Sequence, residues 1–581
     1  MPQDTPAAAP ALRATDPAGP ATEIPVSLPS TAATPDDNLL WYKDAIIYQV
    51  HVKSFCDSDD DGYGDLRGLI SKLDYIQHLG ATAIWVMPFF KSPLRDDGYD
   101  IEDYFAVNPA YGTVDDVRAL VAAAHERGLR IIMEMVINHT SDQHPWFQRA
   151  IAAPLGSVER DFYVWSDDKD QYAGTRIIFL DTEDSNWTWQ PDVERYYWHR
   201  FFSHQPDLNY ENPAVEEAIY GVIDFWAGMG VDGFRLDAIP YLFEEEGTTN
   251  ENLPATHAFL KRLRRYVDEQ YDGRICLLAE ANMMPADSAA YFGDGDECHM
   301  NYHFPLMPRL YMGLAQEDRA EIVKVLERTP PIPESCQWAT FLRNHDELTL
   351  EMVTPEERQW MWDHYCYVPE AKQNMGIRLR LARLMEGSRR KQQLMNILLF
   401  TMPGTPVIYY GDELGMGDNV YLNDRDGVRT PMQWNAETNA GFSHANPQAL
   451  YLPTIVDPEF SFRAINVDVQ EHRPSSMLHW MRKMIALRKR YLCFGRGSMT
   501  MLHPEDKAVL AYIREYEGER VLVVCNLGKR AIAITLDLGG YAGMQCCEIM
   551  GGARFPNAGA GYLLTLQGYG AYLLELSPEG A

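Results

Sequence analysis

Cysteines are few and irregularly placed in this sequence. There are nine in 581 residues, Cys546 and Cys547 are adjacent, and no Cys-x-x-Cys pair occurs. This distribution excludes a dense disulfide framework and a structural zinc site with the usual ligand spacing. We therefore expect a reducing compartment, and the cytoplasm is the simplest expectation.

Long apolar runs and excess positive charge are also missing. No stretch of about 18 or more apolar residues occurs, and residues 1–20 lack the basic segment and apolar core typical of a secretory signal. Lysines and arginines number 51 against 83 aspartates and glutamates, which gives a formal net charge of −32. A field of that sign repels phosphate backbones and anionic lipid. We expect neither nucleic acid nor a membrane as a partner.

The chain does have enough apolar residues for a large core, because 46% of its residues are hydrophobic and 12% aromatic. From Trp41 onward, short apolar runs alternate with amphipathic stretches that have helical spacing, of which 66–79, 114–127 and 214–229 are the clearest. The apolar runs are 45–52, 82–88, 130–139, 231–239, 275–281, 299–304, 338–346 and 406–413. Eight such strand–helix units predict an α/β fold, a (β/α)8 TIM barrel.

Several segments do not fit a simple barrel. Residues 1–38 are rich in Ala, Pro and Thr and are predicted to be a flexible tail. We place the barrel at 39–139 and 206–490, with an inserted domain at 140–205 after the third strand. A lid-like insertion at 347–385 follows the seventh strand. Residues 491–581 alternate short apolar runs with turns, which predicts a C-terminal antiparallel β-sandwich domain.

Polar residues gather where the predicted barrel strands end. They are His139, Asp237, Glu280, His345 and Asp346. In a βα barrel the carboxyl ends of the strands form the face that carries the active site. Two carboxylates there can divide the roles of acid and nucleophile in glycosidic-bond chemistry. Alternation along a strand puts Arg235 on the same face as Asp237, where its charge favours the ionised carboxylate.

Each of these residues alone has a structural explanation. Asp237 can cap a helix, Glu280 can be a solvated loop carboxylate, and the two histidines can be a loop cap and a satisfied core residue. Their joint occurrence at successive strand ends is what favours an active site.

Four short motifs carry a family resemblance. They are INH at 137–139, GFRLD at 233–237, LAEA at 278–281 and LRNHD at 342–346. Their order and spacing resemble the signatures of the α-amylase family, glycoside hydrolase family 13, over about residues 40–580. One departure is Glu134, since many members have Asp at that position.

This resemblance implies roles for individual residues. Asp237 would be the nucleophile, Glu280 the general acid/base, and Asp346 the carboxylate that grips sugar hydroxyls. The family would act by a double displacement through a β-glucosyl enzyme. The residues that would bind or orient the sugar site are Asp96, Tyr99, His139, Arg235, His345 and Arg429, with Arg425 as a weaker candidate than Arg429.

Longer stretches narrow the resemblance to one branch of the family. SPLRDDGYDIEDY at 92–104 and RNHDELTLE at 343–351 resemble the members that interconvert maltose and trehalose. Such an isomerase would transfer glucose within the bound disaccharide and release a little by hydrolysis. We expect Tyr241, Glu347 and Glu351 to help close the pocket, because water must be excluded during the transfer.

Two other readings use the same barrel. An α-glucosidase or oligo-1,6-glucosidase would use the same residues but would need access for water. A catalytically dead sugar-binding or transporter-associated subunit would normally have lost one of the three carboxylates, and all three are present. The sequence leaves open homo-oligomer formation and a separate maltose kinase as a partner.

Two oxygen-rich segments predict structural calcium, with Mg²⁺ as the alternative. Residues 57–65 place carboxylates at every second position around a glycine turn, and an acidic solvated turn is the other explanation. The segment resembles the calcium loop of oligo-1,6-glucosidase relatives. Its implied ligands are Asp57, Asp59, Asp61, Asp65 and the Tyr63 carbonyl. A second site implied by the family comprises Asn138, Asp207, Tyr241, Leu242 and Glu244. No organic cofactor is expected.

Overall fold

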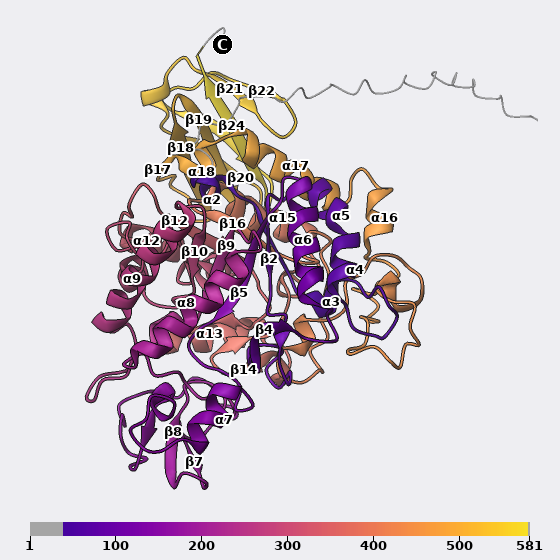
Figure 1. The fold of residues 1–581 in the computed structure, drawn as a ribbon. Helices are drawn as coiled ribbons and strands as arrows, with labels where there is room; N and C mark the ends of the chain where they lie inside the picture. The colour runs from indigo at the N-terminus through magenta and orange to yellow at the C-terminus, as the bar shows by residue number, and fades with distance from the viewer. Residues whose placement is uncertain (1–38, 579–581) are drawn as a thin grey trace, which may run out of the picture. The chain divides into compact units, whose positions relative to one another are not determined.

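The computed structural model describes residues 39–578, so the predicted 1–38 tail lies outside the described residues. Eight parallel strands close into a barrel in the order β1-β16-β12-β11-β10-β9-β5-β2 (Figure 1). They are β1 (Ile47–Val50), β2 (Ala83–Val86), β5 (Arg130–Val136), β9 (Gly233–Asp237), β10 (Cys276–Ala279), β11 (Met300–Tyr302), β12 (Gln337–Phe341) and β16 (Thr405–Tyr409). Each overlaps one of the eight predicted runs, so the predicted barrel is confirmed.

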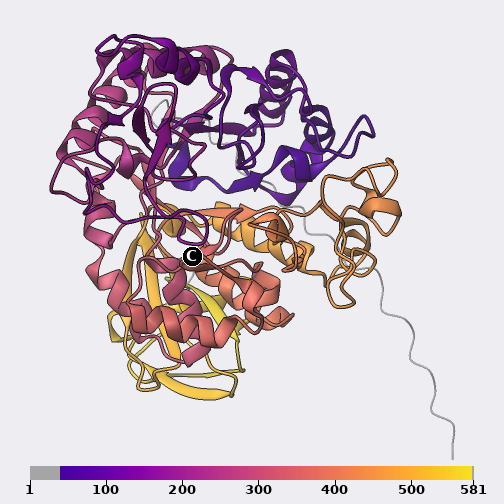
Figure 2. The ribbon, with the colours of Figure 1, turned by 90° about the horizontal axis from the view of Figure 1, so that it is seen from below.

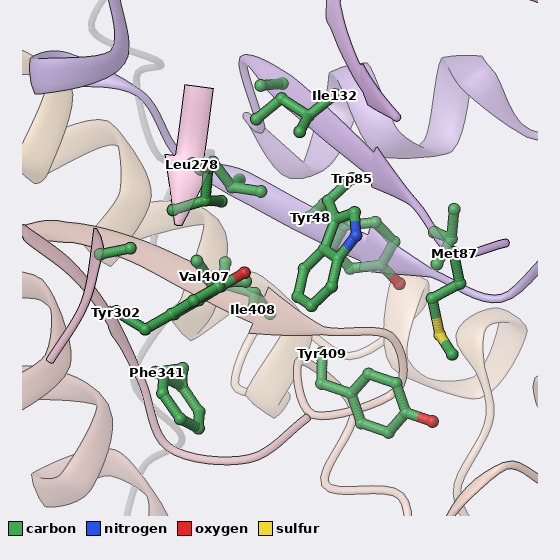
Figure 3. Packing of buried hydrophobic residues seen from close by; sticks show 14 of the residues in the cluster. Tyr48, Trp85, Met87, Ile132, Leu278, Tyr302, Phe341, Val407, Ile408 and Tyr409 are labelled. Atoms are coloured by element: carbon green, nitrogen blue, oxygen red, sulfur yellow. The ribbon is translucent and has the colours of Figure 1, made fainter. Parts of the chain in front are cut away.

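The barrel interior is filled by large side chains. Figure 3 shows Tyr48, Trp85, Tyr302 and Phe341 among the strands, and the rings of Trp85 and Tyr302 lie 5.8 Å apart. Each of these side chains is at most 3% exposed. Strands that are covered on both faces need apolar residues at consecutive positions. That need explains why the strands could be recognised as short apolar runs.

Helices follow most of the barrel strands. The prediction of one helix at 66–79 was wrong in one detail, because two helices occupy it. The chain leaves helical geometry at Lys72, whose N–H turns back to the carbonyls of Leu69 and Ile70. The two helices are α4 (Leu66–Ser71) and α5 (Leu73–Leu79). The longer helices outside the two insertions are α6 (Val114–Glu126), α8 (Pro213–Ala227), α9 (Pro254–Tyr271), α11 (Leu306–Gln316), α12 (Ala320–Arg328), α15 (Arg389–Thr401) and α17 (Met477–Arg490).

The remaining helices outside the insertions are shorter. They are α2 (Trp41–Asp44), α3 (Val52–Phe55), α10 (Pro285–Ala290), α14 (Leu381–Leu384), α16 (Val467–Glu471) and α18 (Cys493–Arg496). The long connection from β16 to α17 forms a lobe of loops that includes α16, drawn in orange in Figure 2. No sequence pattern predicted this lobe. No helix within residues 39–578 combines the length and apolarity needed to cross a bilayer.

Extra elements follow the third and seventh barrel strands, as predicted. After β5 come α7 (Pro145–Ala152), β6 (Trp165–Ser166), β7 (Trp187–Gln190) and β8 (Arg195–Trp198), with the sheet order β6-β8-β7. After β12 come β13 (Leu348–Thr349), α13 (Pro355–Tyr365), β14 (Lys372–Gln373) and β15 (Gly376–Ile377), with the order β13-β15-β14. A hairpin of β3 (Phe90–Lys91) and β4 (Asp103–Val107) follows β2.

The C-terminal region contains two antiparallel sheets, which confirms the predicted β-sandwich. Their orders are β17-β18-β19-β24-β21-β22 and β20-β23. Apolar side chains from both sheets, such as Val524 and Leu564, form one buried cluster. The strands are β17 (Ser498–Leu502), β18 (Val509–Tyr516), β19 (Glu519–Asn526), β20 (Ile532–Leu536), β21 (Gln545–Glu548), β22 (Arg554–Phe555), β23 (Tyr562–Leu566) and β24 (Ala571–Ser577).

Candidate active site

A cavity lies at the carboxyl ends of the barrel strands. Asp237 ends β9, Glu280 directly follows β10, and Asp346 follows β12, and all three line this cavity. The rest of its wall consists of Asp96, Tyr99, His139, Ile178, Phe179, Phe201, Ala238, Tyr241, Asn282, Phe304, Asn344, Glu347, Thr349, Glu351 and Arg425. The barrel thus brings together carboxylates that are more than 40 residues apart in sequence.

One arginine organises the two carboxylates of the expected acid–nucleophile pair. Nη1 of Arg235 contacts both Asp237 and Glu134, and Nη2 contacts Glu280. Arg235 is only 1% exposed. The N–H of Ala238 also donates to Oε2 of Glu280 at 3.1 Å. Two carboxylates on the two ends of one guanidinium lie close together and are both oriented by it.

The environments of these two carboxylates set different proton affinities. Burial raises the pKa of Asp237 to about 6, and the charge of Arg235 limits the rise. Burial raises the pKa of Glu280 to about 8, and the negative charges of Asp237 and Asp346 add to it. Near pH 7, Asp237 is therefore mainly ionised while Glu280 is mainly protonated. A nucleophile and a general acid need these opposite states.

Asp346 is surrounded by one histidine and two arginines. Its Oδ2 lies 2.9 Å from Nε2 of His345, and its Oδ1 lies 3.0 Å from a nitrogen of both Arg425 and Arg429. Burial opposes its charge, but His345 and the two guanidinium groups hold the pKa of Asp346 well below its usual value. Asp346 is thus a fixed anion that can accept hydrogen bonds from sugar hydroxyls.

Other predicted sugar-binding residues also reach the cavity. Asp96 lies 2.5 Å from Nη2 of Arg425 and accepts a hydrogen bond from Gln205 at 2.8 Å. The hydroxyl of Tyr99 is 2.7 Å from Nε2 of His345. Nε2 of His139 is buried and has no hydrogen-bond partner among residues 39–578, and burial lowers the pKa of this histidine to about 3. A neutral imidazole with one free nitrogen suits a ligand hydroxyl.

Three predicted residues lie behind the cavity wall. Arg235, His345 and Arg429 are each 1% exposed and hold the carboxylates from behind. Arg429 also pairs with Asp97 at 2.8 Å. The sequence pattern favoured Arg429 over Arg425 for substrate contact, but Arg425 is the arginine in the wall. The chain turns through a 3₁₀ helix between them, and a sequence motif does not encode which side chain such a turn directs inward.

A second group of residues connects the two insertions at the cavity wall. Nη2 of Arg176 is 3.1 Å from Glu351 and 3.3 Å from the hydroxyl of Tyr241, and Nε is 2.8 Å from Glu251. Asn282 donates to the same Glu351 oxygen at 3.1 Å. The predicted closing residues Tyr241 and Glu351 are therefore joined by an arginine that the sequence did not single out.

Glu347, the third predicted closing residue, lines the cavity as well. Burial raises its pKa to about 7. Apolar wall residues from the inserted segment, Ile178, Phe179 and Phe201, had no sequence signal. They lie in a stretch without strand or helix periodicity.

The acidic loop at 57–65 brings part of the predicted ligand set together. Ligand oxygens of Asp57, Asp59 and Asp61 lie within 4.8 Å of one another. Asp65 instead accepts hydrogen bonds from the N–H of Gly68 at 2.7 Å, which caps α4, and from Ser58. The N–H of Tyr63 donates to Asp61 at 2.8 Å. Three converging carboxylates fit a hard cation, and Asp65 serves helix capping in this arrangement.

The second predicted calcium site has stronger structural support than the first. Oδ1 of Asn138, Oδ2 of Asp207 and Oε1 of Glu244 are all buried, and none has a hydrogen-bond partner in the described part of the chain. Burial raises the pKa of Asp207 to about 8, and burial together with the Asp207 charge raises that of Glu244 well above its usual value. Unpaired buried oxygens are costly. This donor set fits Ca²⁺, with Tyr241 and Leu242 nearby in sequence as carbonyl donors.

Comparisons with known proteins agree with this geometry. The profile described as "Alpha amylase, catalytic domain" matches residues 49–365 and 378–497, and "Maltogenic Amylase, C-terminal domain" matches residues 499–573. "Trehalose synthase/amylase TreS" of Mycobacterium tuberculosis is 53% identical over 94% of this chain and 92% of that protein. "Trehalose synthase" of Thermus thermophilus is 53% identical over 93% of this chain and 56% of that protein.

Solved structures give the same result. An α-glucosyl transfer enzyme, XgtA, has a TM-score of 0.76 and 30% identity, covering 92% of this chain and 99% of that one. A trehalulose synthase has a TM-score of 0.76 and 28% identity over 92% of this chain and all of that one, 100%. The chain belongs to the α-amylase family, glycoside hydrolase family 13. Within that family it groups with the trehalose synthases, as the identities above show.

Proposed function

We propose that the protein interconverts maltose and trehalose by moving a glucosyl unit within the bound disaccharide, with minor hydrolysis to glucose. Relatives that carry the name trehalose synthase support the substrate pair. The observation that carries the chemistry is the arginine that binds both Asp237 and Glu280 while their pKa values lie at about 6 and about 8.

The proposed reaction has two displacements. A carboxylate oxygen of Asp237 attacks the anomeric carbon, the glycosidic C–O bond breaks, and Glu280 gives its proton to the departing oxygen. This step leaves a β-glucosyl ester on Asp237 and one free glucose. The glucose turns, its anomeric hydroxyl attacks the same carbon, Glu280 takes the proton, and the Asp237 carboxylate departs. Two inversions give net retention.

The wall residues fit the binding of a glucosyl unit. Asp346, held as an anion, and His139, with its free nitrogen, offer an acceptor and a neutral partner for hydroxyls. Asp96 and Tyr99 complete the polar side of the cavity. Phe179 and Phe201 supply an apolar side that suits the carbon face of a sugar ring.

The contacts of Arg176 support an isomerase over a hydrolase. The released glucose must stay while it turns, and water must stay out. Arg176 joins the segment after β5 to Glu351 in the segment after β12, directly beside wall residues Ile178 and Phe179. A cavity covered by two joined segments retains glucose better than an open one.

We also propose that calcium stabilises the fold at two places. One comprises Asp57, Asp59 and Asp61, and the other Asn138, Asp207 and Glu244. Neither set includes Asp237 or Glu280. The role assigned to both ions is structural.

The test is to incubate the purified protein with maltose and to follow the anomeric signals by NMR. The proposal predicts a rising α,α-1,1 signal with only minor free glucose, and loss of both products in Asp237→Asn. Glucose as the sole product would mean that the protein is an α-glucosidase. Product formation by Asp237→Asn at the wild-type rate would show that Asp237 is not the nucleophile.

A further inference from the structure

The turn between β14 and β15 touches the segment that follows β5. The backbone N–H of Asn374 donates to Oδ2 of Asp181 at 2.7 Å, and the N–H of Asp181 lies 3.5 Å from Oδ1 of Asn374. Each side chain thus faces the other residue's backbone. Asn374 has φ of +47°, a left-handed conformation that asparagine tolerates better than most residues. This Asp181–Asn374 pair is separate from the contacts of Arg176.

The same turn also reaches the carboxylates of the cavity. Nδ2 of Asn374 lies 3.4 Å from Oε1 of Glu347, which is in the cavity wall. Its neighbour Gln373 donates to Asp424, and Asp424 pairs with Arg425 at 3.2 Å. The turn therefore connects the segment after β5 with two groups that line the cavity.

The Asp181–Asn374 contact fixes one end of a short segment that contributes to the cavity wall. Arg176 anchors one end of a short segment to Glu351, and Asp181 anchors the other end to Asn374. Between these two anchors, Ile178 and Phe179 form part of the cavity wall. A loop fixed at both ends holds its middle residues in place, whereas a loop fixed at one end can swing away.

We propose that the Asp181–Asn374 pair determines reaction specificity by holding Ile178 and Phe179 over the cavity, so that glucose is retained and water is excluded. This inference rests on the proposed function. Without the pair, the segment opens more often at the stage of the glucosyl enzyme. Water then attacks the anomeric carbon, Glu280 takes one proton of that water, and the bond from the anomeric carbon to Asp237 breaks with the carboxylate leaving. Glucose then replaces trehalose as product.

The decisive variants are Asp181→Ala and Asn374→Gly. Glycine accepts the left-handed backbone at 374, so this change removes the side chain without adding strain. We expect about fivefold more glucose per trehalose from maltose in Asp181→Ala, which is the shift that the loss of one net hydrogen bond supports. Asn374→Gly keeps the N–H that donates to Asp181 and loses only the 3.5 Å contact, so its rise should be smaller. Asp181→Asn keeps an acceptor and should stay close to the wild-type ratio. The exposed neighbour Asp184 supplies the matched control Asp184→Ala.

Two further measurements distinguish the loss of the Asp181–Asn374 pair from a general loss of structure. Asp181→Ala removes the acceptor of the Asn374 N–H, whereas Asn374→Gly removes the acceptor of the Asp181 N–H. The double variant Asp181→Ala/Asn374→Gly removes both hydrogen bonds of the pair and should raise the ratio at least as far as either single variant. Hydrogen exchange of residues 176–182 should rise in Asp181→Ala and stay unchanged in Asp184→Ala.

An unchanged product ratio in both single variants, or the same rise in Asp184→Ala, would overturn the inference. Glucose as the sole product of the wild-type protein would instead overturn the proposed function. The hydrogen-exchange measurement would then still test whether the Asp181–Asn374 pair holds residues 176–182 in place. Faster exchange confined to Asp181→Ala would support it, and equal exchange in all variants would refute it.

Discussion

Glu134 offers a sharp test of how the site sets the pKa of its nucleophile. It is fully buried, shares Nη1 of Arg235 with Asp237, and accepts a hydrogen bond from Nε1 of Trp85 at 2.6 Å. After burial and the opposing effect of Arg235, the negative charge of Glu134 is the next contribution that raises the pKa of Asp237. Glu134→Gln removes this charge and keeps an acceptor for Trp85.

The expected size of the pKa shift follows from the distance between the two carboxylates that share Nη1 of Arg235. Two carboxylate oxygens on one nitrogen lie at most about 5–6 Å apart, so at an effective dielectric constant of about 20 their charges repel by about 3 kcal/mol. That repulsion corresponds to about 2 pKa units. Burial raises the pKa of Glu134 to about 7, so only about a tenth of it is ionised near pH 6, where Asp237 titrates. We therefore expect the acidic limb of kcat/KM to move down by about 0.2–0.5 unit.

The assay is the pH dependence of kcat/KM for maltose. The wild-type profile should be bell-shaped, with an acidic limb near 6 from Asp237 and a basic limb near 8 from Glu280. Glu134→Gln should move the acidic limb down, and Glu134→Asp, which keeps the charge, should leave it close to its wild-type position. An acidic limb that stays in place or moves up in Glu134→Gln would refute the reasoning.

Three further predictions concern the general acid Glu280, the contacts of Arg176 and the binding of calcium. Glu280→Gln should lower kcat for maltose by about 10²–10⁴-fold, yet still release a burst of fluoride from α-glucosyl fluoride, whose departure needs no proton; no burst would contradict the assigned role. Arg176→Met should raise the glucose-to-trehalose ratio because Glu351 and Tyr241 lose their common partner, and an unchanged ratio would count against closure by this arginine. Calcium added to chelator-treated protein should stabilise it by about 2.7 kcal/mol at 100 times its dissociation constant, seen as a higher Tm; an equal rise in Asp207→Asn would show that this aspartate is not a ligand.

The barrel could be predicted because its strands are buried on both faces. Such strands appear as short apolar runs, and the residue that ends a run marks the active face of the fold. Asp237 and Glu280 were placed correctly at the cavity for this reason. The signal was weaker at the C-terminal edge. β17 and β22 are short or exposed, so they lack the apolar pattern that reveals a strand.

Contacts between segments far apart in sequence could not be predicted. Arg176 and Glu351 are 175 residues apart, and neither belongs to a periodic element that would orient it. The choice between Arg425 and Arg429 depends on a single turn of chain. Asp65 stays a predicted metal ligand. That it also caps α4 could not be predicted, because this depends on where the helix begins.

The most direct test of the central claim is an isotope experiment with maltose and an excess of ¹³C-labelled glucose. If the glucosyl unit passes from Asp237 to the glucose retained in the same cavity, the trehalose formed should contain little label. Trehalose labelled in proportion to the external glucose would contradict retention in a closed cavity and would show that the acceptor comes from solution.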